Sequence, residues 1–428
     1  MGEEKKQEVS QTFFAEFKQD AEKFAGGKYL TKKELKYRVG DKDLEQTWEI
    51  LKIARSLSAS VLPYEPLKIS YVLTPEIYES LHLCDQDLAN VLRLTEKSAS
   101  AASDYVAEIL SEEAISSSQL EGAVTTVVVA KDILRKKREP RNTDERMIVN
   151  NHRAMQFIRG KADVDLTPEF LCEVQRMVTD GTLDEPEHSG VFRTTDDVWV
   201  RDKRTNKELY HPPKAAEIPR LISALCDFAN ADRKEEKPRF IHPLIMGIAL
   251  HFLIGYIHPF YDGNGRTARA LFYWYVLSRG YRLFEYIPIS KMIKNSPGKY
   301  RDAYLATEND DLDLTYFILY NISCIDKARA VLHEHLENLK SQKSASAQKV
   351  AELSDLKNIR QGNILLYMLE YKGEEFGIDE IAKRFGVTYQ TARTDLMHLN
   401  ALGYLWMRKR GKAQYYSVNS EWRENAGL

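Results

Sequence analysis

Apolar residues recur at helical spacing through most of the first 340 residues of the chain. Between positions 98 and 115 they follow the i, i+3, i+4, i+7, i+8 order of a single helix face. That face consists of Ala102, Tyr105, Val106, Ile109 and Leu110. Further amphipathic segments run from 145 to 330, with Pro and Gly near their ends. The pattern predicts a mainly α-helical core at 96–340, behind a helical or irregular lead-in at 1–95.

One segment of this core departs from the helical pattern. Val198, Trp199 and Val200 lie in an otherwise polar stretch that ends at Tyr210, which predicts a small β-hairpin with its turn near Thr205–Asn206. Such a hairpin could be a structural cover for a pocket. Its edge strand could also pair with an extended target peptide through main-chain hydrogen bonds. Both interpretations stay open.

The pattern changes after residue 340. Residues 341–355 begin with the small, polar stretch SQKSASAQK, which predicts a linker. Three helical segments and an alternating segment follow, at Asn363–Glu370, Ile378–Phe385, Thr388–Leu402 and Tyr404–Val418. This order, with Gly386 at a turn between two helices, predicts a winged helix-turn-helix domain at 356–428.

The composition is that of an ordinary globular protein. The 428 residues include 61 Lys and Arg and 63 Asp and Glu, for a net charge of −2. This balance excludes a protein that covers nucleic acid or anionic membrane with its whole surface, although a local basic patch is compatible with it. The four cysteines form no CxxC pair, so no zinc ribbon or disulfide scaffold is indicated. Without an apolar segment long enough for secretion or a membrane, we expect a cytoplasmic protein.

The densest group of candidate functional residues is HPFYDGNGRTAR, from His258 to Arg269. A turn of Gly263, Asn264 and Gly265 that opens a helix presents several N–H groups to one point, where an anion is favoured. Arg266 and Arg269 are three residues apart, so both can reach along one helix face toward the outer oxygens of a polyphosphate.

Three more residues of this segment have chemistry that suits a nucleotide site. Asp262 is the hard oxygen ligand that a phosphate-bound Mg²⁺ prefers. An imidazole at the loop entrance, His258, could take a proton from an attacking hydroxyl. Phe260 would anchor the loop in the apolar interior. The alternative is a helix-capping loop with a buried histidine and surface arginines, but so many specified residues at fixed spacing favour nucleotide phosphoryl or nucleotidyl transfer.

The same residues resemble the complete active-site motif of Fic-domain adenylyltransferases. The resemblance implies a Fic-fold helical core that transfers AMP from ATP to Ser, Thr or Tyr hydroxyls of target proteins. His258 would be the general base and Asp262 the Mg²⁺ ligand. Asn264 and the loop N–H groups would hold the α-phosphate, Arg266 the β-phosphate and Arg269 the γ-phosphate. GVFR at 190–193, VWV at 198–200 and YHPP at 210–213 are similar to the family's flap region.

A second resemblance lies upstream, in SSSQLEG. Ser117, Glu121 and Gly122 match the family's inhibitory motif, which places an inhibitory helix near 110–122. By that resemblance the Glu121 carboxylate would pair bidentately with Arg269 and take the guanidinium meant for the γ-phosphate. In some relatives this glutamate is also needed for the reverse reaction, removal of AMP. A homodimer is a further expectation from the resemblance.

The predicted winged helix contains candidate nucleic-acid contacts. Thr388, Gln390, Thr391 and Arg393 lie in the first turns of its second helix, and Arg408 and Arg410 lie in the wing. Residues 356–428 contain 11 Lys and Arg against 8 Asp and Glu, which is only mildly basic. DNA binding and docking of a protein therefore both stay open for this domain.

Two other functions are compatible with the motifs. The protein could be a DNA-binding regulator whose nucleotide site is a sensor with little turnover. It could also be an enzyme of the same fold that transfers another nucleotide or a phosphate group. The intact His258 and Asp262 favour a working transferase, and the intact Gly263-Asn264-Gly265 turn favours AMP as the transferred group.

Overall fold

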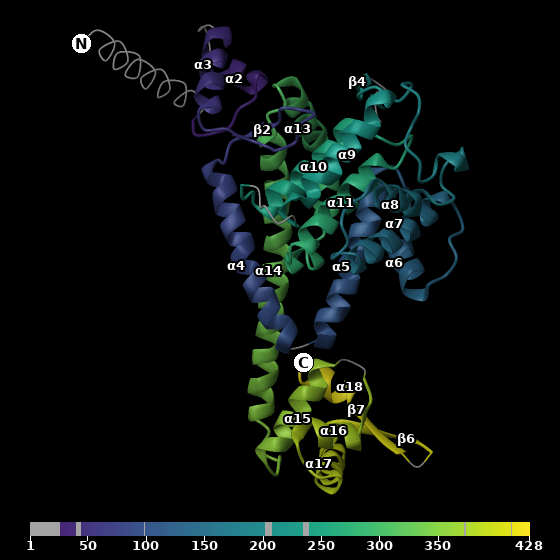
Figure 1. Ribbon diagram of the computed structural model, residues 1–428. Coiled ribbons are helices and arrows are strands. Elements are labelled where there is room, and N and C mark those ends of the chain that lie inside the picture. The colour runs from purple at the N-terminus through teal and green to yellow at the C-terminus, as the bar shows by residue number, and fades with distance from the viewer. Residues whose placement is uncertain are drawn as a thin grey trace, which may run out of the picture. The chain divides into compact units, whose positions relative to one another are not determined.

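The computed structural model describes residues 26–39, 44–97, 99–201, 208–233, 239–371, 374–411 and 413–428. The chain divides into two compact units, Met1–Arg329 and Ala330–Leu428 (Figure 1). The first 25 residues of the predicted lead-in and the predicted hairpin turn at Thr205–Asn206 lie outside the described residues.

The first unit is mainly helical, which confirms the fold class predicted from the apolar spacing. Its α-helices are α2 (Lys32–Val39), α3 (Leu44–Ser56), α4 (Pro75–Lys97), α5 (Ala99–Leu120), α6 (Val127–Lys136), α7 (Thr143–Gly160), α8 (Pro168–Thr179), α9 (Ile218–Asn230), α10 (Pro243–Ile257), α11 (Asn264–Ser278), α12 (Ile289–Lys294), α13 (Pro297–Asn309) and α14 (Thr315–Ala351), which contains the boundary between the units. Short 3-10 turns lie at Pro186–His188, Ala215–Glu217, Ala231–Arg233 and Arg282–Glu285.

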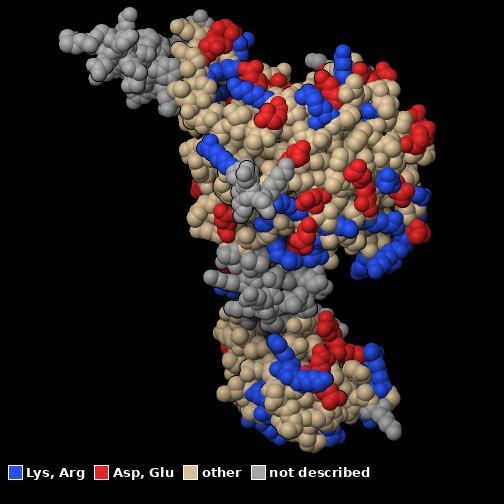
Figure 2. Space-filling model, in the orientation of Figure 1, with Lys and Arg blue, Asp and Glu red and all other residues tan. Residues whose placement is uncertain are grey.

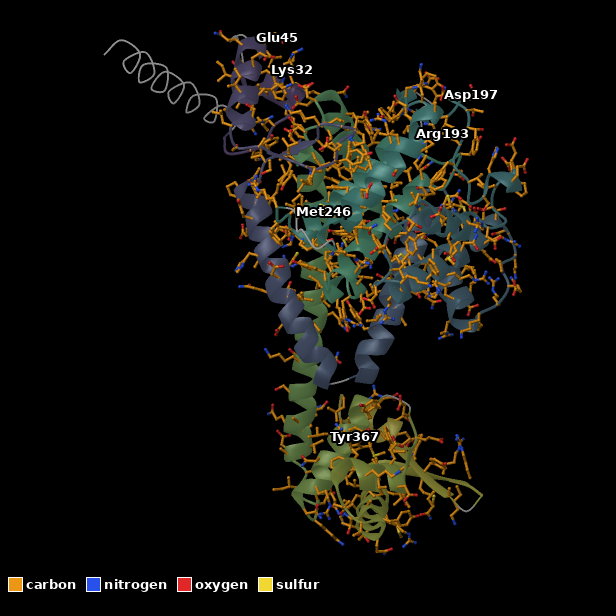
Figure 3. The ribbon with its side chains drawn as sticks, viewed as in Figure 1. Lys32, Glu45, Arg193, Asp197, Met246 and Tyr367 are labelled. Atoms are coloured by element: carbon orange, nitrogen blue, oxygen red, sulfur yellow. The ribbon has the colours of Figure 1, made fainter. Side chains whose placement is uncertain are left out.

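Helices α10 and α11 lie side by side at the centre of this unit (Figure 1). Helix α10 is apolar on all sides and buried over nearly its whole length, Met246 included (Figure 3), as expected for a central helix. Helices α7 and α8 pack against α11, and α9 packs against α10. Helix α5 packs against α7 and α12 and also reaches α11. Among the described residues, no helix is both long and apolar enough to cross a lipid bilayer.

Two small antiparallel pairs interrupt the helices. Strand β1 (Ser60–Val61) pairs with β2 (Ser70–Tyr71), with Ser60 opposite Tyr71. Strand β3 (Val200–Arg201) pairs with β4 (Glu208–Tyr210), with Val200 opposite Tyr210. The second pair lies where the sequence predicts the hairpin. On the face drawn in Figure 2, basic and acidic side chains of this unit are intermixed, in agreement with the small net charge.

The described part of the second unit contains the end of α14, four further helices and a three-stranded antiparallel sheet of order β5-β7-β6. The elements are α15 (Ile359–Glu370), β5 (Phe376–Gly377), α16 (Ile378–Phe385), α17 (Tyr389–Ala401), β6 (Leu405–Arg410), β7 (Ala413–Val418) and a final short helix, α18 (Ser420–Asn425). Gly386 ends α16 in the left-handed conformation, with φ of 62°, and the Thr388 side chain caps α17.

The predicted linker at 341–355 is helical over much of its length, because α14 continues to Ala351. Ala, Gln and Lys in this stretch are good helix formers, so a small, polar composition does not by itself end a helix. The buried core of the unit includes Val350 from this stretch together with Ile364, Leu365, Leu396 and Tyr416.

Candidate active site

The predicted catalytic loop joins the two central helices of the first unit. Helix α10 ends at Ile257 because His258 takes a left-handed conformation, with φ of 48°. Phe260 is fully buried and packs against Phe192 at a ring distance of 5.1 Å. The Asn264 side chain accepts a hydrogen bond from the Phe260 N–H at 3.0 Å and donates one to its carbonyl at 2.8 Å. These contacts fix the loop between the end of α10 and the start of α11.

His258 is half-buried in this loop. Its Nδ1 lies 3.3 Å from the Gly255 carbonyl oxygen, an acceptor that favours the tautomer with the proton on Nδ1. In that tautomer the Nε2 lone pair is available to accept a proton. Burial lowers the pKa of the imidazole to about 4, with Arg193 acting in the same direction. His258 is therefore neutral at pH 7, which is the state a general base requires.

The first turn of α11 offers main-chain N–H groups to an anion. Gly263 precedes the helix with φ of 80°, a conformation that favours glycine. The first intrahelical bond is donated by Thr267 to the Gly263 carbonyl, so the N–H groups of residues 264–266 have no acceptor within the helix. Both polar groups of the Asn264 side chain are engaged by Phe260. In this conformation Asn264 can offer a phosphate its main-chain N–H and the second hydrogen of Nδ2, but not its side-chain oxygen.

Asp262 and Arg266 lie together beside this turn. The Asp262 side chain is 60% exposed, and Oδ2 lies 3.4 Å from Arg266 Nη2. Its Oδ1 accepts a hydrogen bond from the Gly263 N–H at 2.6 Å. Arg266 is buried and donates from Nη1 to the Val178 carbonyl, while its buried Nε has no hydrogen-bond partner among the described groups.

An exposed carboxylate beside an anion-binding turn fits the usual mode of Mg²⁺, which takes one or two carboxylates together with substrate phosphates and water. No cluster of three or more His, Cys, Asp or Glu suited to a metal occurs among the described residues. Asp262 would accordingly hold the ion only together with bound nucleotide phosphates.

Arg269 is buried and faces the end of α5. Its Nη2 donates to Glu121 Oε1 at 2.9 Å and to the Ser117 carbonyl at 3.0 Å. Its Nε donates to Ser117 Oγ at 2.9 Å. The resemblance to the inhibitory motif predicts the Glu121 pairing, and the structure adds that Ser117 also accepts hydrogen bonds from the guanidinium. The Glu121 carboxylate also lies over Gly265, in the first turn of α11.

The buried residue Arg193, labelled in Figure 3, connects the hairpin to the catalytic loop. Arg193 Nε donates to the His258 carbonyl and its main-chain N–H to the Pro259 carbonyl, both at 2.9 Å. Its Nη1 and Nη2 donate to the carbonyls of Thr195 and Pro213 on the two sides of the hairpin. One arginine thus connects the base of the predicted flap to the predicted general base.

The three predicted flap residues occupy the start of the hairpin. Val198 and Val200 are half-buried, while Trp199 is exposed and packs edge-on against His211 at 4.2 Å. Val200 lies in β3, which belongs to a two-stranded sheet and therefore has an outer edge. The geometry is compatible with both interpretations, a cover and a docking strand.

In the second unit the predicted contact residues lie at the start of α17 and in strand β6. Gln390 is exposed, and Thr391 and Arg393 are half-buried. The Thr388 side chain caps α17, so its hydroxyl is engaged locally. Arg408 and Arg410 are exposed in β6, and both form ion pairs with Glu375, at 3.1 and 2.7 Å.

Residues outside the motifs complete the site. Gln175 donates from Nε2 to the Asp262 carbonyl at 2.9 Å and accepts from the Gly190 N–H, so it supports the loop from α8. Glu113 on α5 contacts Tyr273 and Ser290. Its position four residues before Ser117 and eight before Glu121 is a helical spacing that could have revealed it. No comparable signal points to Gln175.

Comparison with known proteins agrees with this geometry. Residues 165–276 match the Fic/DOC family, a segment that contains α8, α10, the catalytic loop and most of α11. A crystal structure of a Fic family protein from Desulfovibrio desulfuricans G20 aligns with 80% of this chain and 96% of its own, with a TM-score of 0.51 and 16% sequence identity. Residues 165–276 of this chain therefore form a Fic domain.

Curated relatives of the Fic domain are named protein adenylyltransferase Fic. The one from Culex quinquefasciatus is 30% identical over 162 residues, which are 38% of this chain and 28% of the relative. The one from Drosophila melanogaster is 24% identical over 263 residues, 59% of this chain and 49% of the relative. The aligned part thus spans about half or less of these relatives.

Proposed function

We propose that this protein transfers AMP from ATP to hydroxyl groups of proteins, itself included, and that Glu121 holds the activity low. The observation that supports it best is the arrangement of the site residues. A neutral His258, an exposed Asp262 and an anion-binding helix start lie together, and the outermost arginine, Arg269, is occupied by Glu121. The adenylyltransferase relatives support the choice of AMP among the groups that such a site could transfer.

The reaction follows from these positions. A target Ser, Thr or Tyr hydroxyl attacks the α-phosphorus of ATP while His258 Nε2 takes its proton. The new bond joins the hydroxyl oxygen to phosphorus, the bond to the β-phosphate oxygen breaks, and pyrophosphate leaves. Main-chain N–H groups at the start of α11 stabilise the developing charge on the α-phosphate. Arg266 and Arg269 hold the outer phosphates, and Mg²⁺, held by Asp262, would neutralise phosphate charge.

The inhibition follows from competition for Arg269. A carboxylate that accepts from Nη2 and lies over Gly265 repels a γ-phosphate and displaces it from the guanidinium. ATP bound beside Glu121 would present its α-phosphate out of line with the attacking hydroxyl. A misalignment of about 1 Å is enough to slow such a reaction about a hundredfold.

The test is transfer of label from α-³²P-ATP with Mg²⁺. Wild type, Glu121→Gly and Glu121→Gly with His258→Ala are compared on the protein itself and on lysate proteins. We expect low labelling of wild type, a strong rise in the single variant and loss of label in the double variant. γ-³²P-ATP is the control for phosphate transfer, and competition by other nucleoside triphosphates tests the base. A folded single variant that takes no label overturns the proposal.

A second candidate function concerns the second unit. Its helix α17 starts with exposed polar residues, and the exposed wing strand contains Arg408 and Arg410, which suits contact with a DNA groove and backbone. Glu375 neutralises part of this charge, so the binding that we propose is weak and strongly salt-dependent.

Fluorescence anisotropy with duplex DNA at 50 and 200 mM salt tests this second function. Arg408→Ala with Arg410→Ala should weaken binding and reduce its salt dependence, and Lys357→Ala, an exposed position outside the helix-turn-helix, should leave it unchanged. Equal binding by all three proteins would point instead to a unit that docks protein.

A further inference from the structure

Helix α5 presents three polar residues at intervals of four, Glu113, Ser117 and Glu121, with Glu121 just past its last turn. Residues four apart lie on one helix face, so the three form a single stripe. Glu113 and Ser117 are buried, and the stripe faces α11 and α12. Ser117 and Glu121, the two residues nearer the C-terminal end of α5, bind Arg269, as described above. Glu113, the first residue of the stripe, has no assigned role.

Glu113 makes the densest set of contacts in the stripe. Its Oε2 accepts from the Tyr273 hydroxyl at 2.8 Å and from the Ser290 N–H at 2.9 Å. Its Oε1 accepts from the Ser290 hydroxyl. Burial raises the pKa of this carboxyl, while the donors of Ser290 and Tyr273 and the charge of Arg269 act against the shift. A buried carboxyl with this many donors is held in one position.

The partners of Glu113 connect it to the inhibitory contact. Tyr273 lies four residues, about one turn, after Arg269 on α11. Helix α11 therefore contacts α5 twice, through Tyr273 to Glu113 and through Arg269 to Glu121. The Tyr273 hydroxyl also accepts from the Ile289 N–H at 2.8 Å, which ties the start of α12 into the same group. Glu121 lies beyond the last helical residue, Leu120, and is followed by Gly122. The position of the Glu121 carboxylate therefore depends on how the preceding turns of α5 are held against α11 and α12.

We infer that Glu113 is a positioning residue for the inhibitory glutamate. It fixes α5 against α11 and α12 two turns before Glu121 and so keeps the Glu121 carboxylate on Arg269. The inference rests on the proposed function, because it assigns a second residue to the control of the same site. Loss of the Glu113 contacts frees the end of α5 and raises activity, whereas a residue with only a structural role lowers activity when it is replaced.

The neighbouring Glu112 provides a matched control. It lies on the same helix and pairs with Lys291 on the same α12, at 2.8 Å. Its side chain is more exposed than that of Glu113, and partly exposed ion pairs contribute little. Glu112→Gln and Glu113→Gln make the same chemical change at adjacent positions, and only the second alters the buried contacts to Tyr273 and Ser290.

The experiment measures two quantities on the full chain. One is hydrogen–deuterium exchange of the segment 117–122 without nucleotide, and the other is self-labelling from α-³²P-ATP. We expect Glu113→Gln to speed exchange of this segment and to raise labelling by about threefold or more, since hydrogen bonds to a buried charge are strong. Ser290→Ala, which keeps the carboxylate, should do the same to a smaller extent. Glu112→Gln should change neither quantity.

Combination with Glu121→Gly separates the outcomes. Once Glu121 is gone, Glu113→Gln should add less than about twofold to labelling, because the two residues act on one contact. Unchanged exchange of 117–122 in a folded Glu113→Gln protein, or labelling that falls while exchange rises across the whole helix bundle, overturns the inference. If a folded Glu121→Gly protein takes no label, the proposed activity fails, and the exchange measurement still decides whether Glu113 positions the end of α5.

Discussion

The carboxylate of Glu121 lies against Gly265. A Cβ atom at position 265 would lie 2.3 Å from Glu121 Oε1, closer than any stable contact, and 3.2 Å from Arg269 Nη1. Glycine at 265 therefore leaves room for an anionic group at the start of α11. In this structure Glu121 occupies part of that room, and we infer that a nucleotide phosphate would use it once Glu121 is displaced.

Gly265→Ala should consequently displace Glu121 without activating the enzyme. The added methyl group pushes away the flexible Glu121 side chain, but it also narrows the approach of a phosphate to the N–H groups of α11. We expect self-labelling to stay low in the wild-type background. In the Glu121→Gly background we expect it to fall by about tenfold or more, since phosphate contacts of this kind act in the transition state.

Gly298→Ala is the control for this substitution. Gly298 lies in α13 and a Cβ there meets no atom within 4 Å, so its replacement should leave labelling unchanged. A rise to the Glu121→Gly level on Gly265→Ala alone would show that position 265 contacts only the inhibitory glutamate and not the nucleotide.

On acidification, labelling should be lost only at a pH well below the ordinary histidine pKa of 6.5. His258 acts as a base only when neutral, and burial lowers its pKa from 6.5 to about 4. As pH falls, the neutral form is kept until the pH approaches this value. In the Glu121→Gly enzyme, kcat/KM, which reports the free enzyme, should therefore stay level to about pH 5 and then decline.

Circular dichroism at each pH provides the control for acid unfolding. An acid limb centred near pH 6.5 in a folded enzyme would mean that the imidazole is not desolvated in the free protein, and would count against the neutral, Nδ1-protonated state.

Arg193→Lys should lower labelling more than it lowers stability. The guanidinium of Arg193 donates to carbonyls of the catalytic loop and of both sides of the hairpin, and a single ammonium group cannot make the same set of bonds. In the Glu121→Gly background we expect labelling to fall by about tenfold. Arg153→Lys, at an exposed position of α7, should have no effect on labelling. Equal labelling by both variants would remove Arg193 from the group of positioning residues.

Removal of Mg²⁺ should abolish labelling, and Asp262→Asn should raise the Mg²⁺ concentration that is needed. Asp262 is the exposed carboxylate beside the nucleotide position, and an amide oxygen is a weaker ligand for Mg²⁺ than a carboxylate. EDTA added to the Glu121→Gly enzyme tests the first point. A Mg²⁺ titration of Glu121→Gly with and without Asp262→Asn tests the second, and identical titration curves would exclude Asp262 as the ligand.

The sequence predicts the local part of the site well. The fixed spacing from His258 to Arg269 forms a loop and a helix start, and the structure brings its base, carboxylate and arginines together through short-range geometry alone. The turn at Gly263-Asn264-Gly265 predicts the start of a helix, and α11 begins at Asn264. Arg266 and Arg269 are buried because hydrogen bonds compensate their charge, and no hydrophobicity pattern reveals that.

The long-range part of the site could not be derived from spacing. Glu121 and Arg269 are 148 residues apart, and only the resemblance to a known inhibitory motif predicts their pairing. The engagement of the Asn264 amide by Phe260 depends on a loop conformation that composition does not determine. Arg193 lies inside a segment that the resemblance singles out, yet its role emerges only from the carbonyl groups that surround it.

The stability of the second unit should depend on Asp395. This buried carboxylate on α17 accepts from Arg360 Nε at 2.6 Å and from Gln361 Nε2 at 3.0 Å, both on α15. Although burial alone would raise it, the pKa of Asp395 is lowered, because the hydrogen bonds and the charge of Arg360 outweigh desolvation. A lowered carboxyl pKa stabilises the fold above the value of the unfolded chain, and that stabilisation is lost as pH falls through the folded value.

We therefore expect Asp395→Asn to lower the free energy of unfolding of this unit by about 1–3 kcal/mol at pH 7, since buried donors lose a charged acceptor. Below about pH 4, where wild type loses the same stabilisation, the difference between the two proteins should shrink. Calorimetry on the full chain, with hydrogen exchange of α15 and α17 to identify the transition, measures both effects. Asp379→Asn, at an exposed position of α16, is the matched control. If the two proteins differ in free energy of unfolding by the same amount at pH 7 and pH 3, the shape of the Asp395 side chain, and not its charge, stabilises the contact with α15.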